Sequence, residues 1–102
     1  MTFGSQIAAA RKALGMSQKD LAAKITKEDG EPISPQYLND IEHDRRNPPS
    51  EEMIYQFANE LKLAPEVLFY LSGKLPQDLT KSTVGREKIV AAYQAFRKAL
   101  KK

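Results

Sequence analysis

The sequence is a succession of short apolar stretches with helical spacing, most of which follow a residue that commonly caps a helix. Phe3, Ile7, Ala10 and Leu14 step by four, three and four residues, which places them on one helix face. No run of four or more residues alternates apolar and polar side chains with the β-branched or aromatic enrichment of strands. The spacing therefore predicts an all-α fold.

Capping residues and prolines set the expected bounds of five helices. Ser17 precedes the second helix, and Asp20 stands three residues later in a capping-box-like position. Ser34 followed by Pro35 opens the third helix, and Ser50 opens the fourth. The expected helices span residues 3–14, 18–25, 35–43, 51–62 and 65–72, with Gly15 and Gly73 suited to the left-handed residue that ends a helix.

The segment between the second and third expected helices is polar. It runs from Thr26 to Ile33 and contains Asp29-Gly30 and Pro32, which favour a turn and disfavour a continuing helix. We expect a loop here.

A sixth amphipathic helix is expected near the C-terminus. Ile89, Tyr93, Phe96 and Leu100 again step by four, three and four residues. Such a seam can fold back on the rest of the chain or pair with a second copy, and two heptads are too few to hold a coiled coil alone. The expected organisation is a domain over residues 1–75, followed by a linker and a basic helix over residues 76–102.

Composition excludes several classes of protein. The chain has 102 residues, no cysteine and one histidine, so Cys/His metal sites and Cys- or Ser-His nucleophiles have almost no residues to use. We expect no enzyme, no catalytic or metal-binding residues and no cofactor. The apolar runs fall far short of the roughly 20 residues that cross a bilayer, and no secretory signal is recognisable. We expect a cytoplasmic protein that does not enter the membrane.

Charge is distributed unevenly along the chain. The net charge of +3 results from neutral residues 1–50, a charge of −3 over residues 51–80 and a charge of +6 over residues 81–102. The basic tail could be a solvated helix face, a contact to phosphates or an anionic membrane, or an interaction arm.

Several short motifs occur in a fixed order along residues 3–72. They are Arg11-x-x-Leu14-Gly15-x-Ser17-Gln18, Leu21-Ala22, Ile33-Ser34-x-x-Tyr37-Leu38, Ile41-Glu42 and Asn47-Pro48-Pro49-Ser50. As a set they resemble the Cro/repressor-type (Xre family) helix-turn-helix domain. The resemblance implies a five-helix lambda-repressor-like DNA-binding domain, here followed by an additional C-terminal helix.

The resemblance makes residues 35–43 the recognition helix. By alignment its base-facing positions are Pro35, Gln36, Asn39 and Asp40, with Tyr37 beside them. The amides of Gln36 and Asn39 can read adenine, and Asp40 can accept a hydrogen bond from cytosine. Plain solvent exposure is the competing interpretation for the two amides, and packing fits Tyr37 as well as DNA contact does.

Other residues are expected to position the protein on the DNA backbone. Family members use the residue at the Gln18 position for a phosphate, and Lys19 and the loop residues Arg45 and Arg46 can share that face. A simple charged loop is the competing interpretation for the two arginines. The family also implies an ion pair between Arg11 and Glu42 with a scaffolding role.

Two features depart from the family pattern. The turn at residues 26–33 is longer than the usual turn of about four residues, and its three acids disfavour close approach to phosphates. Residues 1–50 carry no net charge, which limits nonspecific affinity. We therefore expect modest affinity of a monomer and a need for dimerisation.

The leading interpretation is a sequence-specific regulator of transcription, expected to act as a repressor that binds a palindromic operator in double-stranded DNA as a homodimer. The alternative is an antitoxin-like or phage-type regulator whose main role is to bind a protein partner, with autoregulatory DNA binding. A membrane-surface or RNA-binding module would depend on the tail alone, and the chain lacks an aromatic platform for stacking bases.

Overall fold

The computed structural model describes residues 1–46, 49–81 and 83–101, and in this part of the chain the regular elements are helices. An isolated antiparallel bridge joins Thr26 to Pro32. The helices are α1 (Phe3–Ala13), α2 (Gln18–Ala22), α3 (Pro35–Glu42), α4 (Glu51–Leu61), α5 (Pro65–Ser72), α6 (Gln77–Thr80) and α7 (Arg86–Leu100). The all-α prediction is confirmed.

The predicted caps form. The hydroxyls of Ser17, Ser34 and Ser50 accept hydrogen bonds from the backbone N–H groups three residues later, and Asp20 completes a capping box with Ser17. The residues Gly15 and Gly73 have positive φ angles of 71° and 74°, as expected at helix ends. Local sequence chemistry thus determines where these helices begin and end.

Two expectations about the helices were wrong, and one short helix was missed. Helix α2 ends at Ala22 rather than at residue 25, because Lys24 and Ile25 donate to the carbonyls three residues earlier and the chain leaves the α-helix. Leu14 caps the end of α1 and is 41% exposed, so it does not extend the buried face. The short helix α6 was not expected, and its first N–H group donates to the Glu51 carboxylate at 2.7 Å.

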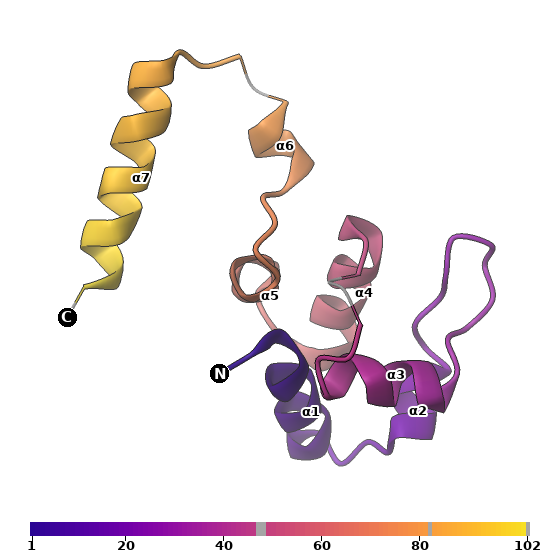
Figure 1. Ribbon diagram of the computed structural model, residues 1–102. Coiled ribbons are helices and arrows are strands. Elements are labelled where there is room, and N and C mark those ends of the chain that lie inside the picture. Colours follow the sequence, from indigo (N-terminus) through magenta and orange to yellow (C-terminus); the bar gives the residue numbers. More distant parts are fainter. Residues whose placement is uncertain (47–48, 82, 102) are drawn as a thin grey trace.

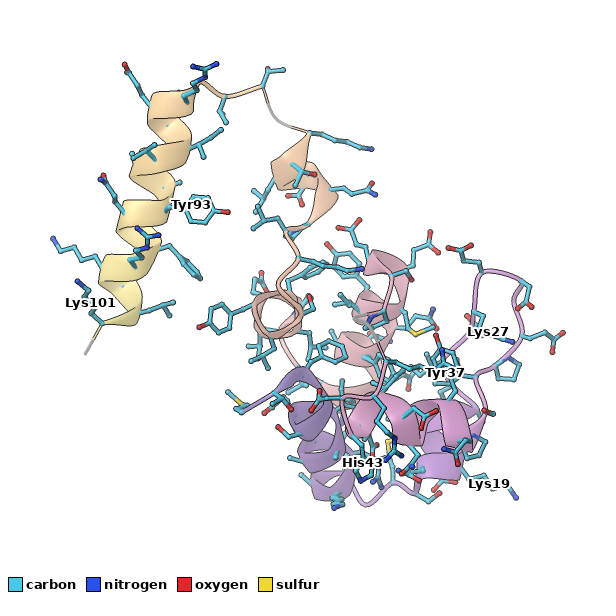
Figure 2. All side chains as sticks on the ribbon, in the orientation of Figure 1. Lys19, Lys27, Tyr37, His43, Tyr93 and Lys101 are labelled. Atoms are coloured by element: carbon cyan, nitrogen blue, oxygen red, sulfur yellow. The ribbon has the colours of Figure 1, made fainter. Side chains whose placement is uncertain are left out.

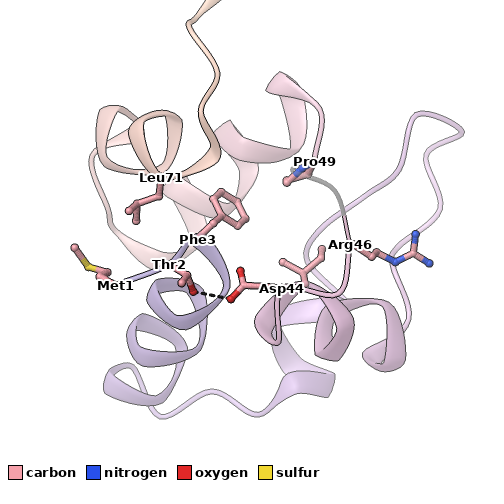
Figure 3. A pocket seen from close by; sticks show the side chains of 8 residues that line it. Met1, Thr2, Phe3, Asp44, Arg46, Pro49 and Leu71 are labelled. Carbon is pink, nitrogen blue, oxygen red and sulfur yellow. Dashed lines mark hydrogen bonds between the residues drawn. The ribbon is translucent and has the colours of Figure 1, made fainter.

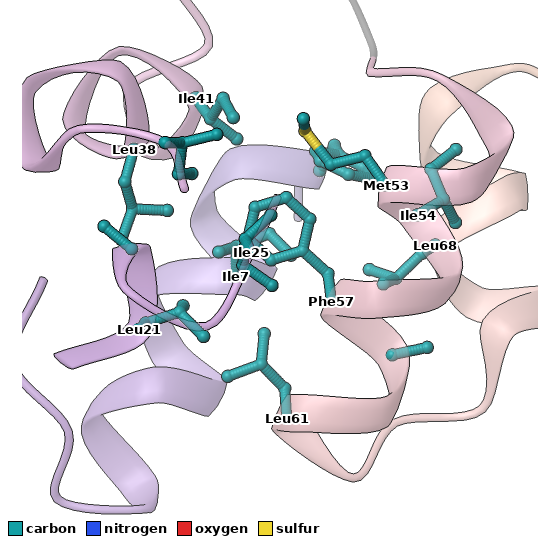
Figure 4. Close-up of a cluster of buried hydrophobic side chains, with 14 of the residues drawn as sticks. Ile7, Leu21, Ile25, Leu38, Ile41, Met53, Ile54, Phe57, Leu61 and Leu68 are labelled. Atoms are coloured by element: carbon teal, nitrogen blue, oxygen red, sulfur yellow. The ribbon is translucent and has the colours of Figure 1, made fainter. Parts of the chain in front are cut away.

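One apolar core holds α1 to α5 together (Figure 4). Helix α1 packs on α3, α4 and α5, while α2 packs on α3 and α4 packs on α5. The core consists of Phe3, Ile7, Leu21, Ala22, Ile25, Ile33, Leu38, Ile41, Met53, Ile54, Phe57, Ala58, Leu61, Leu68 and Phe69. Burial of these side chains is the main force that fixes α2 and α3 relative to each other.

Helix α7 contributes nothing to this core. Figure 1 shows it set apart from α1 to α5, beyond α6. The Phe96 ring meets the Tyr70 ring of α5 with their centroids 5.9 Å apart, yet both side chains remain about half exposed. The amphipathic helix predicted near the C-terminus is therefore present, and most of its apolar face is accessible to solvent.

Candidate nucleic-acid interface

Helix α3 presents a polar face to solvent because its other face belongs to the core. Leu38 and Ile41 are 0% and 3% exposed. Pro35 and Gln36 are exposed, and Asn39 and Asp40 are partly buried beside them. Ser34 accepts from the backbone N–H of Tyr37 at 3.0 Å, which fixes the start of the helix. The predicted base-facing residues therefore lie along one accessible face.

Gln36, Asp40 and Arg45 form a polar cluster on this face. The Asp40 Oδ1 atom accepts from Gln36 Nε2 at 3.1 Å and from Arg45 Nε at 3.2 Å. Because the Gln36 and Arg45 side chains are exposed, water or a ligand can replace these bonds at little cost. The cluster orders three predicted contact residues without burying them.

The Gln18 side chain turns toward α3. Its Nε2 atom donates to Asn39 Oδ1 at 3.1 Å and to Glu42 Oε1 at 2.9 Å. The family resemblance implied that Gln18 contacts a phosphate at the start of α2. The structure instead ties it to a predicted base-facing residue, and α2 and α3 are coupled through it.

A buried ion pair holds the Glu42 carboxylate that accepts from Gln18. Arg11 Nε donates to Glu42 Oε2 at 2.7 Å and Arg11 Nη2 donates to Glu42 Oε1 at 3.0 Å, while Arg11 Nη1 donates to the carbonyl of Met16 at 2.8 Å. Arg11 and Glu42 are only 8% and 7% exposed. The predicted scaffolding pair is confirmed, and it joins α1 to the end of α3.

The same pair controls the ionisation of both groups. The hydrogen bond to Glu42 raises the pKa of Arg11 above its ordinary value. Burial alone would raise the pKa of Glu42, but the hydrogen bonds from Arg11 and Gln18, together with the Arg11 charge, outweigh burial and lower it. Glu42 is therefore a carboxylate at neutral pH and can only accept hydrogen bonds.

Tyr37 and Arg46 form a second pair at the other edge of α3. The Arg46 guanidinium carbon lies 3.9 Å from the centroid of the Tyr37 ring, a cation–π geometry. In Figure 2, Lys19 and His43 lie along the lower edge of the α2–α3 pair, whereas Tyr37 lies above α3 toward the loop that carries Lys27. Tyr37 is partly buried against the core, so it packs and also holds an arginine.

The loop after α3 is fixed to the start of α1 by Asp44 (Figure 3). Asp44 has a left-handed φ of 58°, and its carboxylate accepts from the Gly4 N–H at 2.9 Å and from the Thr2 hydroxyl at 2.6 Å. Phe3, Ile41, Pro49 and other neighbours line a cavity of about 380 Å³ beside this contact. The contact determines where the chain leaves α3 and hence where Arg45 and Arg46 begin.

The long turn between α2 and α3 is an ordered hairpin-like loop. The Lys27 N–H donates to the Glu31 carbonyl and the Ile33 N–H donates to the Ile25 carbonyl, both at 2.8 Å. From α4, the Gln56 amide accepts from the Thr26 N–H at 2.7 Å and donates to the Thr26 carbonyl at 3.0 Å. A cavity of about 410 Å³ separates this loop from Tyr37 and the start of α4. The loop is thus fixed to α4 and leaves the polar face of α3 open.

Sequence reasoning missed the roles of Gly4, Asp44 and Gln56. Each acts on a residue 30 or more positions away, and no local pattern identifies such a contact. The expected residues Asn47 and Pro48 lie outside the described residues.

Within the described residues, no three or more His, Cys, Asp or Glu side chains are grouped so that they could hold a metal ion. Over the same residues, no helix combines the length and apolar character needed to span a membrane.

Comparisons with known proteins agree with this geometry. One chain of the solved SinR protein/SinI protein complex is similar in fold, with a TM-score of 0.55 and 24% identity, and the match covers 96% of this chain and 99% of that chain. No curated protein matches the sequence. The helix-turn-helix family model matches residues 7–68, which include α2 and α3 together with most of the core that holds them. The chain therefore belongs to the Xre/Cro-type helix-turn-helix family of DNA-binding regulators.

Proposed function

We propose that this chain is a sequence-specific repressor of transcription that acts in the cytoplasm and binds a palindromic operator as a homodimer. One observation carries the proposal: Gln36, Asn39 and Asp40 share the accessible face of a capped helix whose other face is fixed in the core. Helices presented in this way enter the major groove and read base edges with short polar side chains. Family members are regulators and not typically enzymes.

The contacts divide into two groups by chemistry. Pro35, Gln36, Asn39 and Asp40 face the bases. Lys19, Arg45 and Arg46 lie around them and contact phosphates, as does Gln18 through its backbone N–H, with Tyr37 holding the Arg46 guanidinium in place. The acids Glu28, Asp29 and Glu31 stand on the loop between α2 and α3, where they disfavour a phosphate contact. The affinity for DNA therefore depends on a small number of lysine and arginine side chains.

Replacing Arg46 with alanine should weaken binding to all DNA sequences by about tenfold, because one phosphate contact is lost. The slope of log affinity against log salt concentration should flatten by about one unit. Fluorescence anisotropy of a labelled duplex at several salt concentrations measures both effects. Lys24→Ala is the matched control, since Lys24 lies at the end of α2 with its ammonium 3.9 Å from Glu60 of α4. An unchanged slope for Arg46→Ala would remove Arg46 from the interface.

We further propose that residues 1–75 form the DNA-binding domain and that residues 76–102 form a linker and a dimerisation arm. Helix α7 carries a seam of Ile89, Tyr93, Phe96 and Leu100, which are 43–54% exposed. Within the part of the chain that the structure describes, the Tyr70–Phe96 ring contact is the cover seen on this apolar face. The proposed cover is the same seam of a second copy, because an operator with two-fold symmetry requires a two-fold dimer.

Substituting serine for both Ile89 and Phe96 should shift the chain from dimer to monomer, because two large apolar side chains leave the seam. Sedimentation velocity over a range of concentrations measures the change. Gln94→Ser, on another face of α7, serves as the control. Affinity for the operator should fall together with dimerisation. A double variant that keeps the association state of the original chain would exclude the seam as the dimer contact.

A second candidate function gives α7 a different partner. The solved structure with a similar fold is itself a complex of two proteins, named SinR and SinI. An antitoxin-like or phage-type regulator would use the basic, apolar-faced α7 to bind a protein partner and would bind DNA for autoregulation. A monomeric chain that still binds DNA would favour this candidate over the homodimer.

A further inference from the structure

The direction of the Asn39 side-chain amide is fixed by hydrogen bonds that begin at a buried carboxylate. An amide's orientation follows from its partners, since its oxygen accepts and its nitrogen donates. The Glu42 carboxylate only accepts, so Gln18 must turn Nε2 toward it, and the separation is 2.9 Å. The same Nε2 atom donates to Asn39 Oδ1 at 3.1 Å. The Asn39 oxygen is therefore engaged on the α2 side, and its NH2 group is the end left for a ligand.

This arrangement resists reversal. Turning the Gln18 amide over would place its oxygen against the Glu42 carboxylate, which is a repulsive contact. Glu42 cannot move aside, because Arg11 holds both of its oxygens and the two residues are buried. The ion pair between α1 and α3 thus determines which atom Asn39 offers on the face of α3.

Gln36, on the same face, differs in this respect. Its Nε2 atom donates to Asp40 Oδ1 at 3.1 Å, but Gln36 is exposed, and this Asp40 oxygen also accepts from the exposed Arg45. Gln36 can release this bond and turn either end of its amide toward a base. The side-chain amide of Gln36 is therefore free to turn over, whereas that of Asn39 is not.

We propose that Asn39 reads DNA as a donor only, and that it selects guanine at its base pair. The inference rests on the proposed function. Bidentate reading of adenine requires the oxygen and the nitrogen of one amide together, and the Asn39 oxygen is turned away. Guanine offers two adjacent acceptors, N7 and O6, within reach of one NH2 group, whereas cytosine offers only a donor. Thymine offers one acceptor beside a methyl group.

The test compares operators that differ only at the base pair read by Asn39. This base pair is found by selection from randomised duplex DNA, as the position at which Asn39→Ala removes the base preference of the original chain. The original chain should prefer guanine over adenine there by about tenfold. Gln18→Ala keeps the Arg11–Glu42 pair but frees the Asn39 amide, so this preference should fall to about twofold. Any general change in affinity caused by Gln18→Ala cancels in the ratio.

Gln36→Ala provides the matched control, because it should alter a different base pair and leave the Asn39 ratio unchanged. The inference is overturned if Asn39→Ala abolishes no preference, if the original chain prefers another base at this pair, or if Gln18→Ala leaves the ratio at its original value. Failure of the original chain to bind any sequence would overturn the proposed function as well.

A second readout requires no DNA. Nuclear magnetic resonance of the side-chain amides should show slow solvent exchange for the Gln18 protons, which are bonded to Glu42 and Asn39, and fast exchange for the Asn39 protons. Gln18→Ala should leave the Asn39 exchange rate nearly unchanged. Protected Asn39 protons beside freely exchanging Gln18 protons would mean that both amides point the other way, and the donor-only assignment would fail.

Discussion

Replacing Arg11 with methionine should destabilise the fold by about 3 kcal/mol at neutral pH. Methionine is apolar and of similar reach, so it fills the space but leaves the Glu42 carboxylate buried without its cation. The hydrogen bonds from Arg11 to Glu42, at the end of α3, and from Arg11 to the Met16 carbonyl are lost together. Urea unfolding followed by circular dichroism measures the loss.

The cost of Arg11→Met should also depend on pH. In the original chain the pKa of Glu42 is lowered, so its contribution to stability is complete above the ordinary pKa of a glutamate and is lost as pH falls through the lower, folded-state pKa. In the variant, burial without the cation raises the pKa of Glu42. The difference in stability between the two chains should therefore shrink between about pH 7 and about pH 4.

A double variant separates the cost of the unpaired buried charge from the cost of the lost Arg11 hydrogen bonds. Arg11→Met combined with Glu42→Leu removes the buried charge altogether and should recover a large part of the lost stability. A loss below about 1 kcal/mol for Arg11→Met alone, or a loss that is the same at both pH values, would contradict the role assigned to the ion pair.

Replacing Gly4 with alanine should cost about 3 kcal/mol, at the upper end of overpacking effects. A Cβ atom at this position would clash with the Ile41 carbonyl oxygen and would lie 2.6 Å from the Glu42 carbonyl oxygen and 2.7 Å from Asp44 Oδ1. Two of these atoms are backbone, so relief requires α1 to move away from the end of α3. Specific DNA affinity should fall too, because Arg45 and Arg46 follow this junction.

Gly85→Ala is the matched control for Gly4→Ala. Gly85 precedes α7 with an ordinary negative φ, and no heavy atom lies within 4 Å of its added Cβ. The free energy of unfolding of the Gly85→Ala variant should differ from that of the original chain by no more than about 0.5 kcal/mol. Thermal unfolding of the two variants under the same conditions compares them. Equal midpoints would show that α1 does not pack against α3 as closely as the structure indicates.

The features that could be predicted from the sequence are the local ones. Ser17, Ser34 and Ser50 act on residues three positions away, so their capping roles and the starts of three helices follow from the sequence alone. The helical periodicity of apolar side chains predicted that Phe3 and Ile7 are buried and that an amphipathic helix, α7, forms near the C-terminus. The base-facing positions of α3 followed from the resemblance to the helix-turn-helix family.

The features that could not be predicted depend on contacts across the fold. Helix α6 is only four residues long, and its start is fixed by Glu51, 26 positions earlier. The long turn is ordered by Gln56, whose amide resembles that of any surface glutamine in the sequence. The inward direction of Gln18 depends on Glu42, 24 positions later, being buried and charged. The direction of a side-chain amide depends on its hydrogen-bond partners in the folded chain, and these partners cannot be identified from a local sequence pattern.

Selection from a pool of randomised duplex DNA with the full chain is the direct test of base reading by α3. We expect one enriched sequence with two-fold symmetry, in which the half-sites are separated by about one helical turn or a multiple of it. Gln36→Ala should relax the preference at one base pair of each half-site and leave the others intact. A pool that remains random after repeated rounds, or a preference that Gln36→Ala scales down equally at every position, would contradict base reading by α3.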